Sequence, residues 1–276
     1  FSYNNPNLQQ IPARDSADAE LKIGTLIRSL FLPEDGEKWG SFDYSQQEPR
    51  LVVHYANKVG LEGSQKLLEA YQNDKNTDFH TIMAEIANIP RKSAKTINLG
   101  LFYGMGVGKL SDQMGIDPAE AKALINQYNE RVPFVRQLAD KVSDHAQRKG
   151  RVRTILGRQC RFDLWEPKSF GAHKAYPYEK AIEEYGSNIG LKRAGTYKSL
   201  NRLIQGSAAD QIKKAMVELH KEGIIPMIQI HDELAISVDG SKEQQDKIIE
   251  VMENCLEMEI PSKVDVAVAK NWGEAQ

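Results

Sequence analysis

The sequence is poor in cysteine and contains no long apolar run. Its 276 residues include two cysteines, Cys160 and Cys255, without CxxC or metal-type spacing. We therefore expect reduced structural thiols and neither a disulfide framework nor a cysteine metal site. No apolar stretch approaches the length of a membrane helix, and no basic-then-apolar leader opens the chain. These absences predict a cytoplasmic protein without a membrane partner.

The sequence also lacks a large excess of either charge. A formal net charge of -2, with 41% hydrophobic and 27% charged residues, is ordinary for a soluble globular protein and does not indicate a nucleic-acid partner. One segment departs from this balance. "AQRKGRVRTILGRQCR" carries six cations and no acid, namely Arg148, Lys149, Arg151, Arg153, Arg158 and Arg161. This basic strip fits either a track for phosphates or a solvated cationic face.

Strand patterns occur near both ends of the chain, and helical patterns fill the middle. Asp117 and Pro118 predict a helix start, and a second helix is expected from Pro133 to Gly150. A further helix is expected over "KSLNRLIQGSAADQIKKAMVELHKEG", closed by Gly223, whereas residues 162–197 have no clear period and predict an irregular excursion. The pattern predicts an α+β fold, with one sheet built from distant segments and a helical insertion.

Acidic residues stand at two strand ends. In "PMIQIHDELAIS", apolar residues alternate on both sides of His231, Asp232 and Glu233, which predicts a hairpin with these residues at its tip. In "KWGSFDYSQQEPR", a short strand ends at Asp43 before a helical pattern begins. Carboxylates at a hairpin tip fit either a solvated turn or a metal site.

The segment "IPRKSAKTINLGLFYGMG" places Arg91, Lys95, Leu99 and Tyr103 four residues apart, on one face of a predicted helix that Pro90 begins. The two cations suit a triphosphate, and the apolar and aromatic residues suit a sugar or base. Gly100 and Gly104 would allow close approach to the backbone. The alternative is an amphipathic surface helix with two snorkelling cations.

"DYSQQEPR", "RKSAKTINLGLFYG" and "QIHDEL", in this order, resemble motifs A, B and C of the family A, Pol I-like DNA polymerases. "NPNLQQIP", "DFH", "TILGR", "LNRLIQGSAAD" and "NWGEA" also resemble segments of that family. The resemblance spans nearly the whole chain and is weakest at residues 162–197. It implies an antiparallel palm sheet and mostly helical fingers, in a right-hand polymerase architecture that lacks the thumb.

The resemblance implies template-directed DNA synthesis in a bacterial or phage-infected cell, with primer-template DNA and dNTP as partners. Two Mg²⁺ ions would be held by Asp43, Asp232 and the Tyr44 carbonyl, and Glu233 would support them. Lys95, Arg91 and His80 are expected on the triphosphate, with Lys95 also acting in catalysis as proton donor to the departing pyrophosphate. Glu48 is expected as steric gate, or as the partner of Ser45 in a capping box, and both can hold. The remaining expected site residues are Tyr103, Leu99 and Gln46 around the nucleotide, and Asn201, Gln205, His231 and Arg50 on the DNA.

The sequence departs from the family pattern at a few positions. Leu99 stands where the family commonly has Phe or Tyr, and this change is expected to alter discrimination at the 3′ position of the sugar. Pro49 would remove an early helix hydrogen bond unless the helix begins there. Gln47 is unusual, and Tyr197 replaces a basic residue that would contact DNA.

The resemblance implies palm at residues 1–52 and 200–276 and fingers at 53–199. We expect a thumb, and often an exonuclease region, upstream in the same chain or on a separate chain. Two rival functions remain open. A two-metal nuclease would use the Asp pair without the face at residues 91–103, and a nucleic-acid-binding module would use the basic strip without needing either Asp.

Overall fold

The computed structural model describes residues 8–12, 23–169 and 171–275. The opening segment "NPNLQQIP" therefore lies partly outside the described residues. The chain divides into two compact units. We call them the sheet unit, Phe1–Gln47 with Ala208–Gln276, and the helical unit, Glu48–Ser207. The assignment of palm and fingers to particular residue ranges stays a prediction. None of the described helices has the length and apolar character that a bilayer crossing requires.

The sheet unit joins strands that are far apart in the sequence. Its four-stranded sheet has the order β7-β8-β1-β9, and every neighbouring pair is antiparallel. The strands are β1 (Lys38–Tyr44), β7 (Ile228–Ile230), β8 (Glu233–Val238) and β9 (Val264–Ala269); the helices are η1 (Leu8–Gln10), α1 (Ile23–Arg28), α11 (Lys242–Asn254) and, from Ala208, α10 (Ser199–Lys221). The predicted hairpin and the strand ending in motif A are both confirmed.

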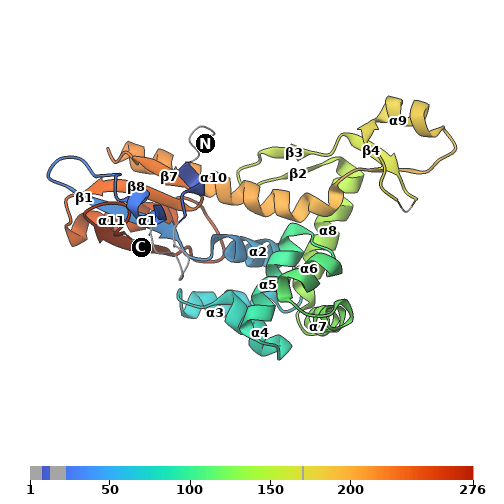
Figure 1. Cartoon of the computed structure of the whole chain (residues 1–276), viewed down its shortest axis with the longest axis horizontal. Helices are drawn as coiled ribbons and strands as arrows, with labels where there is room; N and C mark the ends of the chain where they lie inside the picture. The colour runs from blue at the N-terminus through green and yellow to red at the C-terminus, as the bar shows by residue number, and fades with distance from the viewer. Residues whose placement is uncertain (1–7, 13–22, 170, 276) are drawn as a thin grey trace. The chain divides into compact units, whose positions relative to one another are not determined.

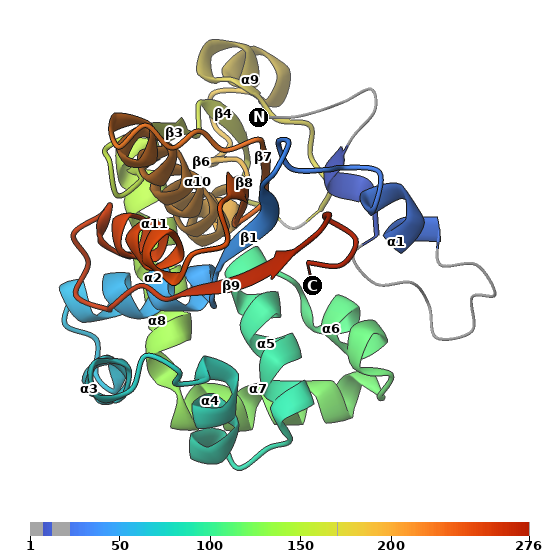
Figure 2. The same cartoon turned by 90° about the vertical axis from the view of Figure 1, so that its left-hand side faces the viewer.

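The two faces of this sheet have different cores. Phe42 and Leu234 point toward α10 and α11 and pack with Ile212 and Ile248. Figure 2 shows α10 and α11 on one side of the sheet and α1 on the other. On the α1 side, Trp39 stacks on Trp272 with ring centroids 6.0 Å apart. Because side chains alternate along a strand, residues 39, 41 and 43 share the face that lies away from α10 and α11.

The helical unit follows the predicted helix signals closely. Asp117 caps α7, accepting a 2.7 Å hydrogen bond from the Ala119 amide, and α8 ends at Gly150 with φ 69°. Figure 1 shows these helices clustered around α5. The elements are α2 (Gln47–Lys58), α3 (Ser64–Asn73), α4 (Phe79–Ala87), α5 (Arg91–Tyr103), α6 (Val107–Met114), α7 (Pro118–Arg131), α8 (Pro133–Lys149), β2 (Arg151–Arg153), β3 (Gln159–Arg161), β4 (Leu164–Pro167), β5 (Tyr176–Pro177), α9 (Tyr178–Tyr185), β6 (Leu191–Arg193) and η2 (Thr196–Lys198).

The prediction of an irregular excursion over residues 162–197 was wrong. This segment forms a three-stranded sheet of order β5-β4-β6 together with α9. Ring contacts stabilise this segment. The ring centroids of Trp165 and Tyr178 lie 5.0 Å apart, and the Arg193 guanidinium stacks 4.5 Å from the Trp165 ring centroid. The strands are too short to show a period of two, which is why the sequence pattern did not reveal them.

Two local expectations are also corrected. Helix α2 begins at Gln47, so Pro49 lies in its first turn, where backbone N–H groups have no intrahelical partner and proline removes no bond. Gly100 does not expose its backbone to a ligand. A Cβ at that position would lie 2.3 Å from the Leu110 side chain, so the missing side chain makes room for α6 against α5.

Candidate active site

The end of β1 and the tip of the β7–β8 hairpin are adjacent. Ile230 pairs with Glu233, which leaves a two-residue turn of His231 and Asp232. His231 has φ 52°, a left-handed conformation that such turns commonly need. The amide of Tyr44 donates a 3.2 Å hydrogen bond to the Asp232 carbonyl. The hairpin tip is thereby fixed beside the last residues of β1.

Asp43 is surrounded by other carboxyl groups. It lies opposite Glu233 on β8 and opposite Asp265 on β9. Its side chain is hydrogen-bonded to that of Asp232. Burial of the carboxyl, followed by the charges of Asp232, Glu233 and Asp265, raises the pKa of Asp43 to about 7. The residue as a whole keeps part of its surface exposed, so incoming ions or phosphates can reach it.

Asp232 shares this environment, because burial raises the pKa of its carboxyl while nearby His231 and the hydrogen bond with Asp43 oppose the rise. Two acids in contact titrate as a pair, with one proton favoured between them. Among the described residues, no three His, Cys, Asp or Glu side chains are grouped to hold a metal ion. Mg²⁺ commonly takes one or two carboxylates, with waters and substrate phosphates completing the shell. The Asp43–Asp232 pair fits that donor set.

Glu233 lies on the same sheet face as Asp43 and is tied to the sheet. Ser41 hydrogen-bonds the Glu233 carboxyl and accepts a 3.2 Å hydrogen bond from the Trp39 indole. Burial raises the pKa of Glu233, and the charge of Arg28 opposes that rise. Its Oε1 atom is buried without a hydrogen-bond partner. Glu233 therefore adds negative charge beside the acid pair, and the hydrogen bond with Ser41 and the charge of Arg28 hold its carboxyl group in place.

In the helical unit, α5 presents the predicted graded face. Arg91 and Lys95 are exposed, and Leu99 and Tyr103 are half-buried. The opposite side of the helix, including Ile97 and Phe102, is buried. Two cations and an aromatic ring therefore line one accessible side, as the spacing of four predicts.

Arg91 is oriented by a neighbouring helix. Its Nη2 atom donates a 2.6 Å hydrogen bond to Asp78, and its Nε atom donates one of 3.1 Å to Thr81. Asp78 is also the N-cap of α4, accepting from the Thr81 amide at 2.8 Å. Partial burial acts to raise the pKa of Asp78, but the hydrogen bonds from Arg91 and Thr81 together lower it. The cation is held at the start of α5 by a carboxylate that stays ionised.

His80 is a buried, neutral hydrogen-bond donor. The Tyr128 hydroxyl donates to the Asn98 carbonyl oxygen, and the Asn98 amide nitrogen lies 3.1 Å from His80 Nδ1. Since an amide nitrogen can only donate, Nδ1 accepts and the proton resides on Nε2. Burial, with the nearby charges of Lys95 and Arg91, lowers the pKa of His80 to about 4. The imidazole therefore offers an uncharged N–H near the two cations.

Glu48 and Tyr103, both predicted to lie near a nucleotide, contact each other. The Tyr103 hydroxyl donates a 3.0 Å hydrogen bond to Glu48 Oε2. Glu48 comes from α2 and Tyr103 from the last turn of α5. The bond fixes the carboxylate relative to the aromatic ring.

The other expected residues differ in accessibility. Asn201 and Gln205 lie one turn apart on α10, with Asn201 half-buried and Gln205 exposed. Gln46 lies in the β1–α2 turn with φ 53°. Arg50 is buried, donates a 2.6 Å hydrogen bond to the Lys75 carbonyl and stacks 4.5 Å from the Tyr71 ring centroid. We therefore correct its expected role from a DNA contact to a link between α2 and α3.

Some residues of this region were not predicted from the sequence. Asp265 could have been found from its place in the alternating "VDVAVA", but its pairing with Asp43 depends on strand order. Asn98 and Tyr128 set the His80 tautomer, yet each looks like an ordinary polar residue within a helical pattern. Ser41, which supports Glu233, gives no sequence signal.

Known proteins resemble this chain over its whole length. The model of DNA polymerase family A matches residues 1–274. A "DNA-directed DNA polymerase" of Pseudomonas phage M6 is 36% identical, and the alignment covers 100% of this chain and 43% of that protein. "DNA polymerase I" of Pseudomonas aeruginosa is 32% identical, with 100% and 28% covered, and the thermostable enzyme of Thermus aquaticus is 30% identical, with 100% and 31% covered.

A solved structure agrees with these matches. The POL domain of Pol1 from M. smegmatis, in complex with DNA primer-template and dNTP, superposes with a TM-score of 0.76 at 29% identity. The superposition covers 99% of this chain and 46% of that one. The chain thus spans less than half the length of these relatives. It has the mixed α+β fold of that domain, and it belongs to DNA polymerase family A.

Proposed function

We propose that this protein catalyses template-directed DNA synthesis. A primer 3′-hydroxyl loses its proton to water and its oxygen attacks the α-phosphorus of a dNTP. A new oxygen–phosphorus bond forms, and the bond from the α-phosphorus to the oxygen that bridges it to the β-phosphorus breaks, which releases pyrophosphate. The observation that carries the proposal is the side-chain contact between Asp43 on β1 and Asp232 in the β7–β8 turn, two residues from opposite ends of the chain. Relatives named as DNA polymerases support the same reaction.

The acid pair is proposed to hold two Mg²⁺ ions, with the Tyr44 carbonyl as a further ligand. When bound, such ions stabilise the attacking and leaving oxygens of an in-line displacement. The raised pKa of Asp43 reflects crowded negative charge, which divalent cations would neutralise. Glu233 adds to the negative potential without needing to contact the ions. His231 at the hairpin tip is proposed to lie near the primer end.

The accessible face of α5 is proposed to bind the triphosphate. Arg91 and Lys95 supply charge-assisted hydrogen bonds to phosphate oxygens, and His80 supplies an uncharged donor from Nε2. The Lys95 side chain forms no hydrogen bond or ion pair with any described residue, so its ammonium group can donate a proton to the departing pyrophosphate. Tyr103 and Leu99 continue the face toward the sugar and base, with Glu48 limiting the space for a ribose 2′-hydroxyl.

We also propose contacts of Asn201 and Gln205 with the DNA and of Gln46 with the nucleotide. Asn201 and Gln205 are suited to reading the minor groove, where hydrogen-bond acceptors are nearly alike for every correct base pair. Gln46 is proposed to lie near the incoming nucleotide.

Primer extension with Mg²⁺ and dNTPs tests the proposal. Asp43→Asn and Asp232→Asn keep side-chain size but remove the charges, so we expect each to lower kcat about a thousandfold or more, because several kcal/mol of charge stabilisation is lost. Asp246→Asn, at an exposed acid paired with Lys242 on α11, is the matched control and should extend primers normally. Hydrolysis of DNA without dNTP-dependent extension would instead identify a nuclease, and activity that persists in both Asp variants would favour a binding module.

A further inference from the structure

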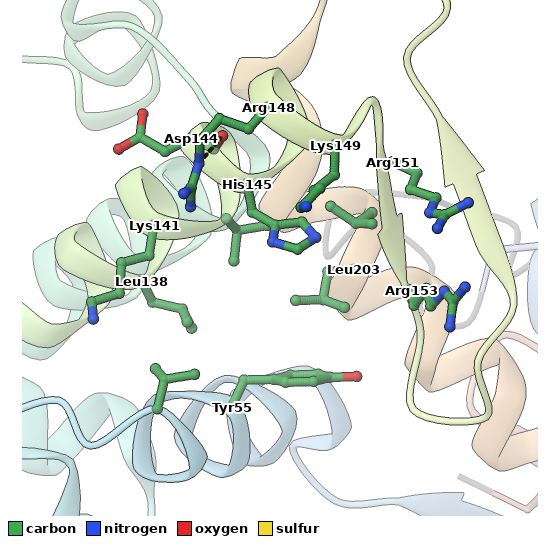
Figure 3. A pocket seen from close by; sticks show the side chains of 13 residues that line it. Tyr55, Leu138, Lys141, Asp144, His145, Arg148, Lys149, Arg151, Arg153 and Leu203 are labelled. Atoms are coloured by element: carbon green, nitrogen blue, oxygen red, sulfur yellow. Dashed lines mark hydrogen bonds between the residues drawn. The ribbon is translucent and has the colours of Figure 1, made fainter.

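The helical unit contains a hollow that the proposed function does not use. It has a volume of about 770 Å³ and lies between α2, α8, β2 and α10. Figure 3 shows Tyr55 on one side of it and His145 and Leu203 on the other. We call it the α8 pocket. Its lining residues are Tyr55, Val59, Leu138, Lys141, Val142, Asp144, His145, Arg148, Lys149, Arg151, Val152, Arg153 and Leu203.

The rim of the α8 pocket is strongly basic. Five of its lining residues are lysine or arginine, and Asp144 is the one acid among them. All five cations are exposed, and none of them forms an ion pair with a described carboxylate. Arg151 makes a 3.3 Å hydrogen bond to neutral Gln159, and Arg148 makes one of 3.4 Å to a backbone carbonyl of its own helix. This unneutralised charge attracts an anionic ligand.

The floor of the α8 pocket is aliphatic. Leu138, Val152 and Leu203 are buried beneath it, and Val59 is a large apolar side chain left 47% exposed. Tyr55 and His145 carry the aromatic rings among the described lining residues, and the Tyr55 hydroxyl lies 2.8 Å from Ser207 Oγ. A ligand that fills this hollow needs an apolar group for the floor as well as negative charge for the rim.

We propose that the α8 pocket docks a partner protein through an acidic peptide that carries a bulky apolar side chain. Its carboxylates would pair with Arg148, Lys149, Arg151 or Arg153, and its apolar side chain would cover Val59. A nucleic-acid strand fits less well, because single strands bind along grooves with several aromatic stacking platforms. The basic strip found in the sequence thereby has a ligand distinct from the proposed DNA and dNTP contacts.

Fluorescence anisotropy with the labelled peptide GSDDELF tests this proposal. We expect the wild-type protein to bind it with a Kd of roughly 10 to 100 µM, and to bind GSDDESS, which lacks the apolar pair, about tenfold more weakly. Arg151→Glu and Val59→Asp should each weaken binding of GSDDELF about tenfold. Both positions are exposed, so neither change disturbs a core. Lys122→Glu, at an exposed lysine of α7 outside the pocket, is the matched control and should bind like wild type.

Two results would overturn the proposal. Equal binding of GSDDELF and GSDDESS would show that the rim attracts any polyanion and that the floor takes no part. Tight binding of a fluorescent oligothymidylate that Arg151→Glu and Val59→Asp both abolish, with no competition from GSDDELF, would show that the α8 pocket is a nucleic-acid site. The peptide readout requires neither catalysis nor DNA, so its failure leaves the proposed polymerase activity untouched.

Discussion

The Tyr103 hydroxyl donates a 3.0 Å hydrogen bond to Glu48, joining the last turn of α5 to the first turn of α2. The carboxylate proposed to limit the space for a 2′-hydroxyl is therefore positioned by the ring proposed to lie near the base. A change at Tyr103 should therefore alter the discrimination between dNTP and rNTP.

Tyr103→Phe keeps the ring and removes the hydrogen bond to Glu48. A hydrogen bond to a charged group contributes about 1.5 to 3 kcal/mol, so discrimination should fall by roughly tenfold or more. The measurement is kcat/KM for a dNTP divided by that for the matching rNTP. Glu48→Ala should have a larger effect, and the double variant should resemble Glu48→Ala alone. A normal ratio in Tyr103→Phe would show that the hydrogen bond does not position the gate.

His80 should make stability depend on pH. Its folded pKa of about 4 lies below its ordinary value of 6.5, so the unfolded chain binds more protons between these values. Its contribution is complete above pH 6.5 and is lost as the pH falls, by about 2 kcal/mol at pH 5. The raised pKa of Asp43 acts in the opposite direction, because it stabilises the fold as the pH falls over the same range. The loss from His80 is therefore measured by urea unfolding at pH 7 and pH 5 as the difference between the wild-type protein and His80→Gln, which lacks it. His220→Gln, at an exposed histidine, should leave it intact; equal pH dependence in both variants would contradict the buried neutral imidazole.

Asp78 caps α4 and also pairs with Arg91. Asp78→Asn can still cap the helix but loses the ion pair, whereas Asp78→Ala loses both. We expect Asp78→Ala to lose about 1 kcal/mol of stability and Asp78→Asn distinctly less. Because an exposed ion pair contributes about 0.2 to 1 kcal/mol, releasing Arg91 should lower KM for dNTP by a factor of about 1.4 to 5 in Asp78→Asn. An unchanged KM would mean that Arg91 does not bind the triphosphate, or binds it without leaving Asp78.

Leu99 is the departure from the family pattern that should affect sugar discrimination. It is half-buried on the accessible face of α5, one turn before Tyr103. Leu99→Phe would place a flat ring beside the sugar and change the preference between dideoxynucleotides and deoxynucleotides. Competitive incorporation by the wild-type protein and the variant measures this preference. Equal ratios would count against a sugar contact at position 99.

The sequence predicted best those helices and strands that are determined by local side-chain periodicity and helix caps. Asp117 and Gly150 marked real helix ends, and the alternation around Asp232 marked a real hairpin. The small sheet at Trp165 and Arg193 was missed, because its strands are short and ring stacking between separate segments holds it together.

The candidate site was predictable in part for the same reason. Motif spacing identified Asp43 and Asp232, but their contact and the raised pKa of Asp43 arise from strand order. The buried hydrogen bonds that fix His80 come from α5 and α7, and no local pattern encodes them. Arg50 was predicted to contact DNA because of its position in motif A, but its side chain is buried in the structure.

Divalent-ion binding at the acid pair is the central claim, and Mn²⁺ titration followed by electron paramagnetic resonance tests it most directly without substrate. A proton on the pair competes with the metal, and the pKa of Asp43 is raised to about 7, so the wild-type protein should bind Mn²⁺ more tightly at pH 8 than at pH 6. Asp43→Asn and Asp232→Asn should lose both the binding and its pH dependence, whereas Asp246→Asn should keep them. If either variant at the pair bound Mn²⁺ like the wild-type protein, Asp43 and Asp232 would not be the metal ligands.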